Sequence, residues 1–237
     1  MTSFTLKLIG IISMLADHIG KAFFPEQQWL TLIGRLAFPI FAFGIAEGYL
    51  HTHDINKYFK RLAIFALISQ IPYMLFNAII SANYWQSTNV IFTLLLGLAA
   101  IFFFDRSSNK AIGFLITLAL CIIAELVHTD YGAYGVSVVL LFYFLSQTMH
   151  EKTLQHKKVR ILDIFLAFSG LTLLRYLHPL LITGLSTHYI QTILCTILSF
   201  VPILLYNGKL GIKCKYLFYV FYPVHQILIA SLCYFIH

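Results

Sequence analysis

The chain has 237 residues, of which 59% are hydrophobic and 11% are charged, and its formal net charge is +7. A soluble domain carries about 25% charged residues, so this composition excludes a soluble globular protein. The positive charge predicts no nucleic-acid partner, because the Lys and Arg residues lie in connecting segments rather than along a surface with interleaved aromatic side chains. The composition instead predicts a single integral membrane domain over residues 1–237.

Nine apolar stretches follow one another along the chain, each close to the roughly 20 residues that a membrane-spanning helix needs. We expect helices at 5–24, 29–51, 59–79, 86–104, 110–128, 132–149, 161–178, 187–206 and 215–236, joined by short polar links. The predicted fold class is therefore all-α, a polytopic transmembrane bundle of about nine helices.

The basic residues gather in alternate connections of this helix pattern. The loops after the second, fourth, sixth and eighth helices hold most of the Lys and Arg residues, and the other loops hold almost none. They are Lys57, Lys60 and Arg61; Arg106 and Lys110; Lys152, Lys157, Lys158 and Arg160; and Lys209, Lys213 and Lys215. By the positive-inside rule, the N-terminus and these four loops face the cytoplasm and His237 lies outside, in the cell membrane of a bacterium.

Prolines and small residues mark points where the helices should bend or approach closely. Pro39, Pro72, Pro202 and Pro223 lie inside expected helices, where each removes a backbone hydrogen bond and predicts a kink. Gly44 and Gly48 form a G-x-x-x-G face that favours helix packing. The four cysteines, Cys121, Cys195, Cys214 and Cys233, have no metal-ligand spacing, so we expect packing roles for them and no metal site.

A few ionisable residues fall inside apolar stretches, where a charge is costly unless it faces a cavity or a partner. Asp17 and His18 lie near the end of the first helix, and Arg35 enters the second at a similar depth. We expect Asp17 to pair with Arg35 across neighbouring helices. Adjacent residues project in different directions on a helix, so His18 should take its partner from another helix. Lys21 can compete for Asp17, but we expect it to extend to the outer interface.

A second polar group is expected at the cytoplasmic end of the second helix. Glu47 and His51 are one turn apart and share a helix face. The basic residues that follow, Lys57, Lys60 and Arg61, suit a ligand rich in phosphate. Topology and contact with anionic membrane lipids explain the same charges equally well.

Two further groups are expected nearer the outer side. Glu125, His128 and Asp130 can form a cluster with Arg175, His178 and His188 that binds an acceptor substrate, although ordinary loop ends have the same composition. In the last helix, Tyr222 and His225 flank Pro223 inside an apolar stretch. A structural role for His225 is as well supported as a catalytic one.

Five segments, in order along most of the chain, resemble the TraX family. They are KLIGIISMLADHIGKAFFP, IGRLAFPIFAFGIAEGYLHTHDINKYFKRLAIFALISQIPY, NVIFTLLLG, DYGAYGV and FYPVHQ. That family is named for the enzyme that acetylates the N-terminus of conjugative F pilin, and it is similar to the wider membrane acyltransferase group that modifies envelope sugars. Residues 106–126 and 146–210 match no recognisable pattern, so the pilin substrate does not carry over.

The resemblance implies an acetyl-CoA-dependent acyltransferase in which His18 is the catalytic base, assisted by Asp17. On this hypothesis acetyl-CoA enters from the cytoplasm, and His18 takes a proton from a hydroxyl or amine of an unidentified envelope acceptor. The expected donor-binding residues are Arg35, His51, Lys57, Lys60 and Arg61. The other expected pocket residues are Glu47, Tyr222 and His225, of which Tyr222 or His225 donates to the developing oxyanion.

Three alternatives stay open at this point. The acetyl group can pass directly to the acceptor or through an acetyl-His18 intermediate. A proton-coupled transporter would use Asp17, His18, Glu47 and His225 as a relay rather than as a catalytic site. A noncatalytic membrane scaffold would keep the buried charges as structural pairs only.

Overall fold

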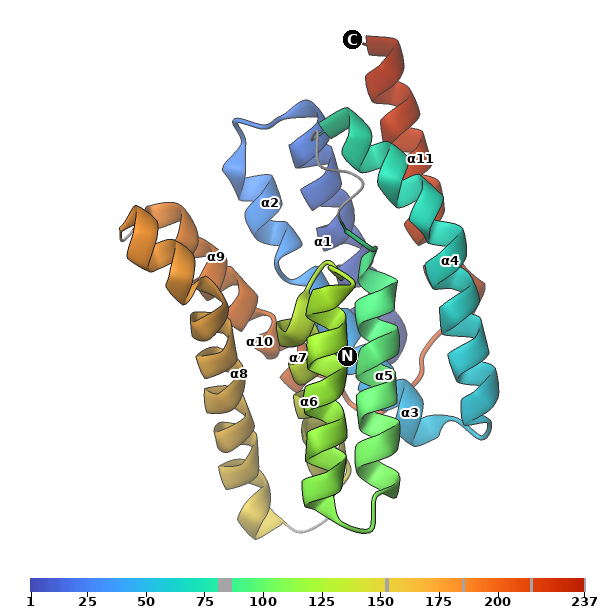
Figure 1. Ribbon diagram of the computed structural model, residues 1–237, viewed down its shortest axis with the longest axis vertical. Helices are drawn as coiled ribbons and strands as arrows, with labels where there is room; N and C mark the ends of the chain where they lie inside the picture. Colours follow the sequence, from blue (N-terminus) through green and yellow to red (C-terminus); the bar gives the residue numbers. More distant parts are fainter. Residues whose placement is uncertain (81–86, 152–153, 185, 214, 237) are drawn as a thin grey trace.

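The computed structural model describes residues 1–80, 87–151, 154–184, 186–213 and 215–236 as a bundle of α-helices (Figure 1). The helices are α1 (Ser3–Phe23), α2 (Gln28–Gly34), α3 (Ala37–His51), α4 (Ile55–Ile80), α5 (Val90–Arg106), α6 (Lys110–Leu126), α7 (Gly132–His150), α8 (Leu154–Thr183), α9 (Thr187–Leu198), α10 (Phe200–Leu204) and α11 (Lys215–Ile236). The described residues contain no β-strand, which confirms the all-α prediction.

Two of the expected helices are broken, and a proline explains each break. Pro39 has no N–H for the carbonyl of Arg35, so the expected helix 29–51 divides into α2 and α3 at Arg35 and Leu36. Pro202 likewise leaves the carbonyl of Leu198 without its helical partner, and α9 ends at that residue. Each broken pair still forms one span, so nine spans of helix remain within the described residues.

Seven helical spans are long and apolar enough to cross a membrane: Ser3–Phe23, Gln28–His51, Ile55–Ile80, Gly132–His150, His156–Ile182, Thr187–Leu204 and Tyr219–Ile236. The remaining two, α5 and α6, have 17 residues each and are shorter than these seven. Figure 1 shows that α1, α4 and α11 extend beyond the turn that joins α6 to α7. The protein is thus a polytopic helical membrane protein in which two of the predicted spans are short.

The basic connections meet at one end of the bundle, which we call the basic end. Ser3 N–H donates to the Lys209 carbonyl at 2.8 Å, so the N-terminus lies against the loop between α10 and α11. The α3–α4 and α5–α6 connections and the start of α8 lie in the lower part of Figure 1, opposite the C-terminal end of α11. This arrangement agrees with the predicted alternation; Lys152 and the side chain of Lys215 lie outside the described residues.

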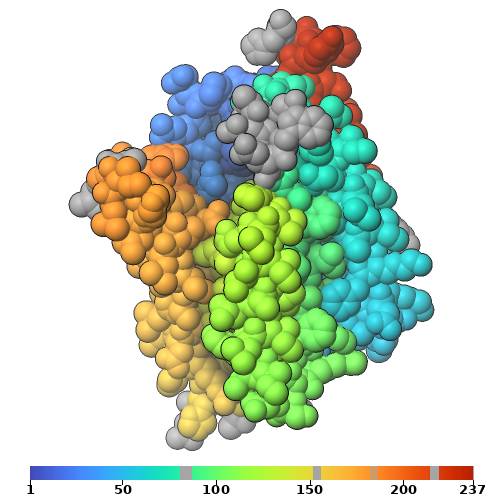
Figure 2. All heavy atoms as spheres, viewed as in Figure 1, coloured from blue at the N-terminus to red at the C-terminus, as the bar shows by residue number. Residues whose placement is uncertain are grey.

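Small and large side chains divide α6 into an inward and an outward face. Its buried residues are Gly113, Thr117, Cys121 and Ala124, one helical turn apart. Its exposed residues include Phe114 and Leu115, at 60% and 62% of their full exposure. Figure 2 shows α6 in the middle of one face of the molecule. Large apolar side chains on an outer face are what a lipid environment favours, and small inward residues let neighbouring helices approach.

The helices α3 and α7 form the centre of the bundle, where α7 also packs against α5, α6 and α8. Gly97 of α5 faces Val139 of α7 so closely that a Cβ at Gly97 would lie 2.6 Å from the Val139 Cβ. The core around this contact is aromatic and aliphatic, and it includes fully buried Phe43, Phe142 and Tyr143.

The segments ISQIPY and NVIFTLLLG meet at the start of α5, where Asn89 is fully buried. Its side-chain amide donates to the Ala66 carbonyl at 2.8 Å and to Gln70 Oε1 at 2.9 Å, and its Oδ1 accepts from the Ile91 N–H. Tyr73 Oη lies 2.9 Å from Ser87 Oγ. These residues are hydrogen-bonded to one another, so the two segments join α4 to α5 and lie in a structural rather than a catalytic network.

The small-residue and cysteine predictions have mixed outcomes. A Cβ at Gly48 would lie 2.6 Å from the Tyr58 hydroxyl, so this glycine accommodates a side chain of α4. Gly44 has only the Lys7 Cε at 4.0 Å, so the pair does not form the close helix contact that G-x-x-x-G suggested. Cys121, Cys195 and Cys233 are free, in agreement with packing roles, and Cys214 lies outside the described residues.

Candidate functional site

His18 of α1 and His225 of α11 form a hydrogen-bonded pair inside the bundle. His18 Nδ1 lies 2.6 Å from His225 Nε2. The two ring planes are within 5° of parallel and their centroids are 4.9 Å apart, as expected for rings that meet edge to edge along this contact. We call these residues the imidazole pair. The expectation that His18 takes its partner from another helix is confirmed.

The backbone of α11 fixes which nitrogens of the neutral imidazole pair carry protons. His225 Nδ1 lies 2.7 Å from the carbonyl oxygen of Phe221, which can only accept, so Nδ1 carries the proton. His225 Nε2 is then an acceptor, and His18 Nδ1–H donates to it. His18 Nε2 is left with a free lone pair, which is the form that a general base requires. Because both nitrogens of His225 are engaged, His225 orients His18 and is not available to donate to an oxyanion.

Asp17 lies beside the open nitrogen of His18 and holds two cations. Its Oδ2 is 3.9 Å from His18 Nε2, too far for a hydrogen bond but close enough to stabilise an imidazolium. Lys21 Nζ lies 2.5 Å from the same oxygen, and Arg35 Nη2 lies 3.9 Å from Oδ1. The predicted Asp17–Arg35 pair is confirmed, whereas the expectation that Lys21 extends away from Asp17 was wrong, because the two are one turn apart on α1.

The break between α2 and α3 brings Arg35 to this position. Arg35 follows Gly34, and a Cβ at Gly34 would lie 2.3 Å from the Asp17 Cβ. Only a residue without a side chain lets the end of α2 approach α1 so closely. The sequence Gly34-Arg35 with Pro39 therefore produces both the contact and the break that place the guanidinium beside Asp17.

Asp130, in the turn before α7, and Arg175 of α8 lie in the same region. Asp130 interacts electrostatically with Lys21, Arg175, Asp17 and Arg35. Part of its side chain is open to solvent, yet desolvation by the surrounding protein raises the pKa of its carboxyl against the lowering effect of the nearby cations. Arg175 donates to the Tyr131 carbonyl at 3.2 Å and lies over the Tyr131 and Tyr134 rings.

The expected outer cluster therefore divides. Asp130 and Arg175 join the Asp17 and Arg35 group, whereas Glu125 Oε1 accepts from the Ala133 N–H at 2.7 Å and so caps the start of α7. Gly132, with φ +51°, allows this approach, since a Cβ there would lie 2.3 Å from Glu125 Oε1. Glu125 is thus structural.

Several buried polar atoms near the imidazole pair have no hydrogen-bond partner among the described residues. Gln226 follows His225 and is fully buried, and neither its Nε2 nor its Oε1 has a partner. Asp17 Oδ1 and Arg35 Nε are also buried without a hydrogen-bond partner. Unpaired polar groups are costly in an apolar interior, so this region suits water or a polar substrate. Sequence reasoning missed Gln226, although it stands in FYPVHQ next to His225.

Five of the other expected site residues, Glu47, His51, Lys57, Lys60 and Arg61, lie at the basic end. Glu47 is buried and contacts His51 of α3, with 3.6 Å between Glu47 Oε2 and His51 Nδ1, as their spacing predicted. Lys57 pairs with Asp54 at 3.1 Å, Lys60 is exposed, and the Arg61 guanidinium lies over the Tyr58 ring. The expected donor-binding set does not assemble as one group, because Arg35 is roughly 24 Å from His51 along the helix direction and belongs with Asp17.

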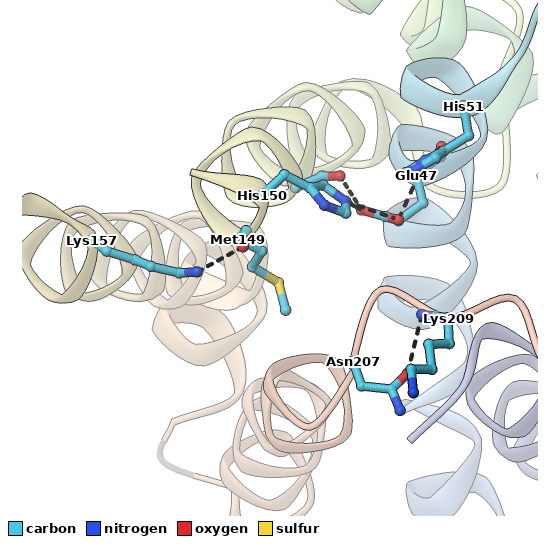
Figure 3. Close-up of polar contacts among 8 residues, drawn as sticks. Glu47, His51, Met149, His150, Lys157, Asn207 and Lys209 are labelled. Atoms are coloured by element: carbon cyan, nitrogen blue, oxygen red, sulfur yellow. Dashed lines mark hydrogen bonds and ion pairs between the residues drawn. The ribbon is translucent and has the colours of Figure 1, made fainter. Parts of the chain in front are cut away.

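Two further residues, Tyr222 and His150, lie next to these groups. Tyr222 is buried one turn before His225, with ring centroids 5.9 Å apart. His150 of α7 lies 3.1 Å from Glu47 Oε1 and was not singled out from the sequence (Figure 3). The only available sign was that the expected sixth helix ends at the same side as Glu47 and His51.

Fold and site together define a polytopic membrane protein in which segments distant in sequence converge on a partly buried imidazole pair. A family model described as TraX protein matches residues 3–233, and the chain belongs to the TraX family. It is 31% identical to the probable fimbrial assembly protein FimC, serogroup H1, of Dichelobacter nodosus, over 97% of this chain and 95% of that protein.

Two other relatives match a smaller share. The chain is 32% identical to the uncharacterized protein RP591 of Rickettsia prowazekii (strain Madrid E), over 62% of this chain and 56% of that protein. It is 27% identical to Protein TraX of Escherichia coli, over 59% of this chain and 54% of that protein. The matched part thus covers about half of each of these two relatives. No solved structure matches the chain.

Proposed function

We propose that this protein is a membrane-embedded acyltransferase that moves an acetyl group from acetyl-CoA to a hydroxyl or amine of an envelope acceptor in the bacterial cell membrane. Membership in the TraX family and similarity to a probable fimbrial assembly protein support a role in modifying envelope components. The observation that carries the proposal is the imidazole pair, which leaves a free lone pair on His18 Nε2 beside Asp17.

His18 Nε2 removes the proton from the acceptor as its oxygen or nitrogen attacks the thioester carbonyl carbon. A tetrahedral oxyanion forms, and its collapse breaks the carbon–sulfur bond and releases the CoA thiolate, which takes the proton from the His18 imidazolium. The Asp17 carboxylate, 3.9 Å away, stabilises that imidazolium. Donors for the oxyanion are the buried side chains of Tyr222 and Gln226, since His225 is occupied by His18 and Phe221.

Acetyl-CoA approaches from the basic end, where His51, Lys57, Lys60 and Arg61 provide positive or polar groups for its phosphates. His18 lies roughly 22 Å from Ser3 along α1, so the pantetheine arm has to enter the bundle. Arg35 is better assigned to the acceptor side, because it pairs with Asp17 rather than with the basic end. Membrane lipids surround the apolar outer faces of the helices.

The test is transfer of labelled acetyl from acetyl-CoA to envelope material by the purified protein in lipid vesicles. We expect His18→Ala to reduce transfer by about 10²- to 10⁴-fold, the usual contribution of general base catalysis. The matched control is His156→Ala, since His156 is an exposed residue of α8 outside both polar regions. Undiminished transfer by His18→Ala would remove His18 from the mechanism.

A proton-coupled transporter built on the same residues predicts a different set of results. It predicts proton-driven solute flux into the vesicles and no change in thermal stability when acetyl-CoA is added. The acyltransferase predicts stabilisation by acetyl-CoA, because a ligand that binds only the folded protein raises its melting temperature. Labelled protein recovered in the absence of acceptor would distinguish an acetyl-His18 intermediate from direct transfer.

A further inference from the structure

Glu47, His51 and His150 form a compact cluster at the basic end, apart from the imidazole pair (Figure 3). Each offers one ligand atom, and these three atoms lie within 4.8 Å of one another. His150 Nε2 is 3.1 Å from Glu47 Oε1, and His51 Nδ1 is 3.6 Å from Glu47 Oε2. His51 Nδ1 donates to the backbone carbonyl of Glu47 at 2.9 Å, so Nε2 is the His51 nitrogen with a free lone pair for a metal.

The surroundings of Glu47 resemble those of a metal-ligating carboxylate. Its side chain is only 9% exposed, and the Ser146 hydroxyl donates to Oε1 from within the core. Ligating carboxylates are usually held in this way by an outer hydrogen bond, which fixes the direction of the ligand oxygen. The partly exposed histidines, with side chains 56% and 39% accessible, allow an ion to enter from the loop side.

A pocket of about 750 Å³ opens beside the cluster, between α3, α7 and α8. His51 and His150 line it together with Arg160 and Asp163. An ion held by three protein ligands at this edge would keep a coordination position turned to the pocket. Sites with two histidines, one glutamate and an open position are a known arrangement for Zn²⁺.

We propose that Glu47, His51 and His150 form a binding site for a zinc-type divalent transition metal, with an open position that faces the pocket at the basic end. The ligands are two imidazoles and a carboxylate, which suit Zn²⁺, Co²⁺ or Ni²⁺; Mg²⁺ and Ca²⁺ prefer oxygen ligands only. The open position would take water or an anionic group of a ligand bound in the pocket.

The metal site does not involve the imidazole pair, although His51 is also one of the residues proposed to bind the phosphates of acetyl-CoA. Glu47 lies roughly 18 Å from Arg35 along the helix direction, so the cluster and the imidazole pair are separate sites. The alternative explanation of the cluster is a network of ion pairs between Glu47 and protonated histidines. The two explanations differ in whether a metal binds with defined stoichiometry and nitrogen ligation.

The experiment uses the full-length protein purified without a histidine tag, stripped with a chelator and titrated with Co²⁺. We expect one Co²⁺ per chain, visible absorption bands typical of a low-coordinate ion, and displacement by Zn²⁺. His51→Ala and His150→Ala should each weaken binding by more than about 10-fold, and Ser146→Ala by about 10- to 100-fold, the effect of removing an outer-shell partner. His156→Ala is the matched control and should bind as the wild type does.

The results separate this proposal from the proposed function. Both histidines of the cluster are partly exposed, so their replacement by Ala should leave the fold intact, which a thermal melt checks. Binding well below one ion per chain, or binding retained when both histidines are replaced, would overturn the metal site. His18→Ala should bind Co²⁺ normally even though it loses acetyl transfer, so either proposal can fail alone.

Discussion

Replacement of His225 by Leu is the sharpest test of how the imidazole pair works. Leu has a similar volume and keeps the packing of α11, but it removes the acceptor that His18 Nδ1–H needs 2.6 Å away. A buried donor left without its acceptor costs about 1–3 kcal/mol. The tautomer and rotamer of His18 that leave Nε2 as the free base lose this amount of stabilisation, so other forms of His18 become populated.

Each 1.36 kcal/mol corresponds to about a tenfold change in rate, so we expect the kcat of acetyl transfer to fall about 10- to 100-fold in His225→Leu. The fall should be smaller than that caused by His18→Ala, because the base itself remains. The KM for acetyl-CoA should stay close to that of the wild type, since His225 lies far from the basic end.

The assay is steady-state transfer of labelled acetyl in vesicles, with His156→Leu as the surface control and a thermal melt of each variant. Wild-type kcat in a folded His225→Leu protein would show that His18 needs no orientation from α11. If kcat fell equally in His225→Leu and in His18→Ala, His225 would instead have a chemical role of its own.

Three further predictions concern the stability of the fold and the placement of Asp17. Gly97→Ala should lower the free energy of unfolding by about 1–3 kcal/mol, as overpacking against Val139 does, and Val139→Ala in the same chain should restore it; Gly170→Ala, with nothing within 4 Å, is the control in thermal melts. Gly34→Ala should displace Asp17 and reduce acetyl transfer while Co²⁺ binding is retained, and loss of both would indicate general misfolding. Asp54→Ala should lower the melting temperature at pH 7 more than Asp54→Asn does, because Asp54 Oδ1 caps α4 through the Lys57 N–H.

The pH dependence of the Asp54 effect follows from its hydrogen bonds. The backbone and side chain of Lys57 lower the pKa of Asp54 in the folded protein. A carboxylate with a lowered pKa stabilises the fold above its unfolded value of about 3.9, and this contribution is lost as the pH falls through the folded value. The difference between wild type and Asp54→Ala should therefore be largest near neutral pH and shrink in acid, and a difference that grows in acid would contradict the assignment.

The helical spans could be predicted from the sequence because each span corresponds to one apolar stretch. This rule located the nine spans, and the basic residues in alternate loops indicated which loops lie at the same end of the bundle. It did not locate the breaks at Arg35 and Ser199, although Pro39 and Pro202 were recognised as kink sites. A proline acts on the carbonyl four residues earlier, so the break appears away from the proline itself.

The site could be predicted where its residues are neighbours in sequence, share a helix face, or enter consecutive helices at the same depth, as Asp17 and Arg35 do. Asp17 and His18 are adjacent, and Glu47 and His51 are one turn apart, so both groups were expected. The partner of His18 comes from α11, 207 residues later, and only the tertiary fold shows that His225 fills that place. His150 was missed for the same reason, since nothing in its own segment connects it with Glu47.

The break at Arg35 connects the fold with the proposed chemistry. A continuous helix through residues 28–51 would satisfy the carbonyls near Arg35 internally and keep its backbone on one axis. Pro39 prevents this, and Gly34 brings the broken end against Asp17, so a guanidinium lies beside a carboxylate at the depth of His18. Both charges are only partly buried, with side chains 26% and 13% exposed. The pair therefore keeps access to water or to a polar acceptor, which a purely structural ion pair inside a membrane bundle would not need.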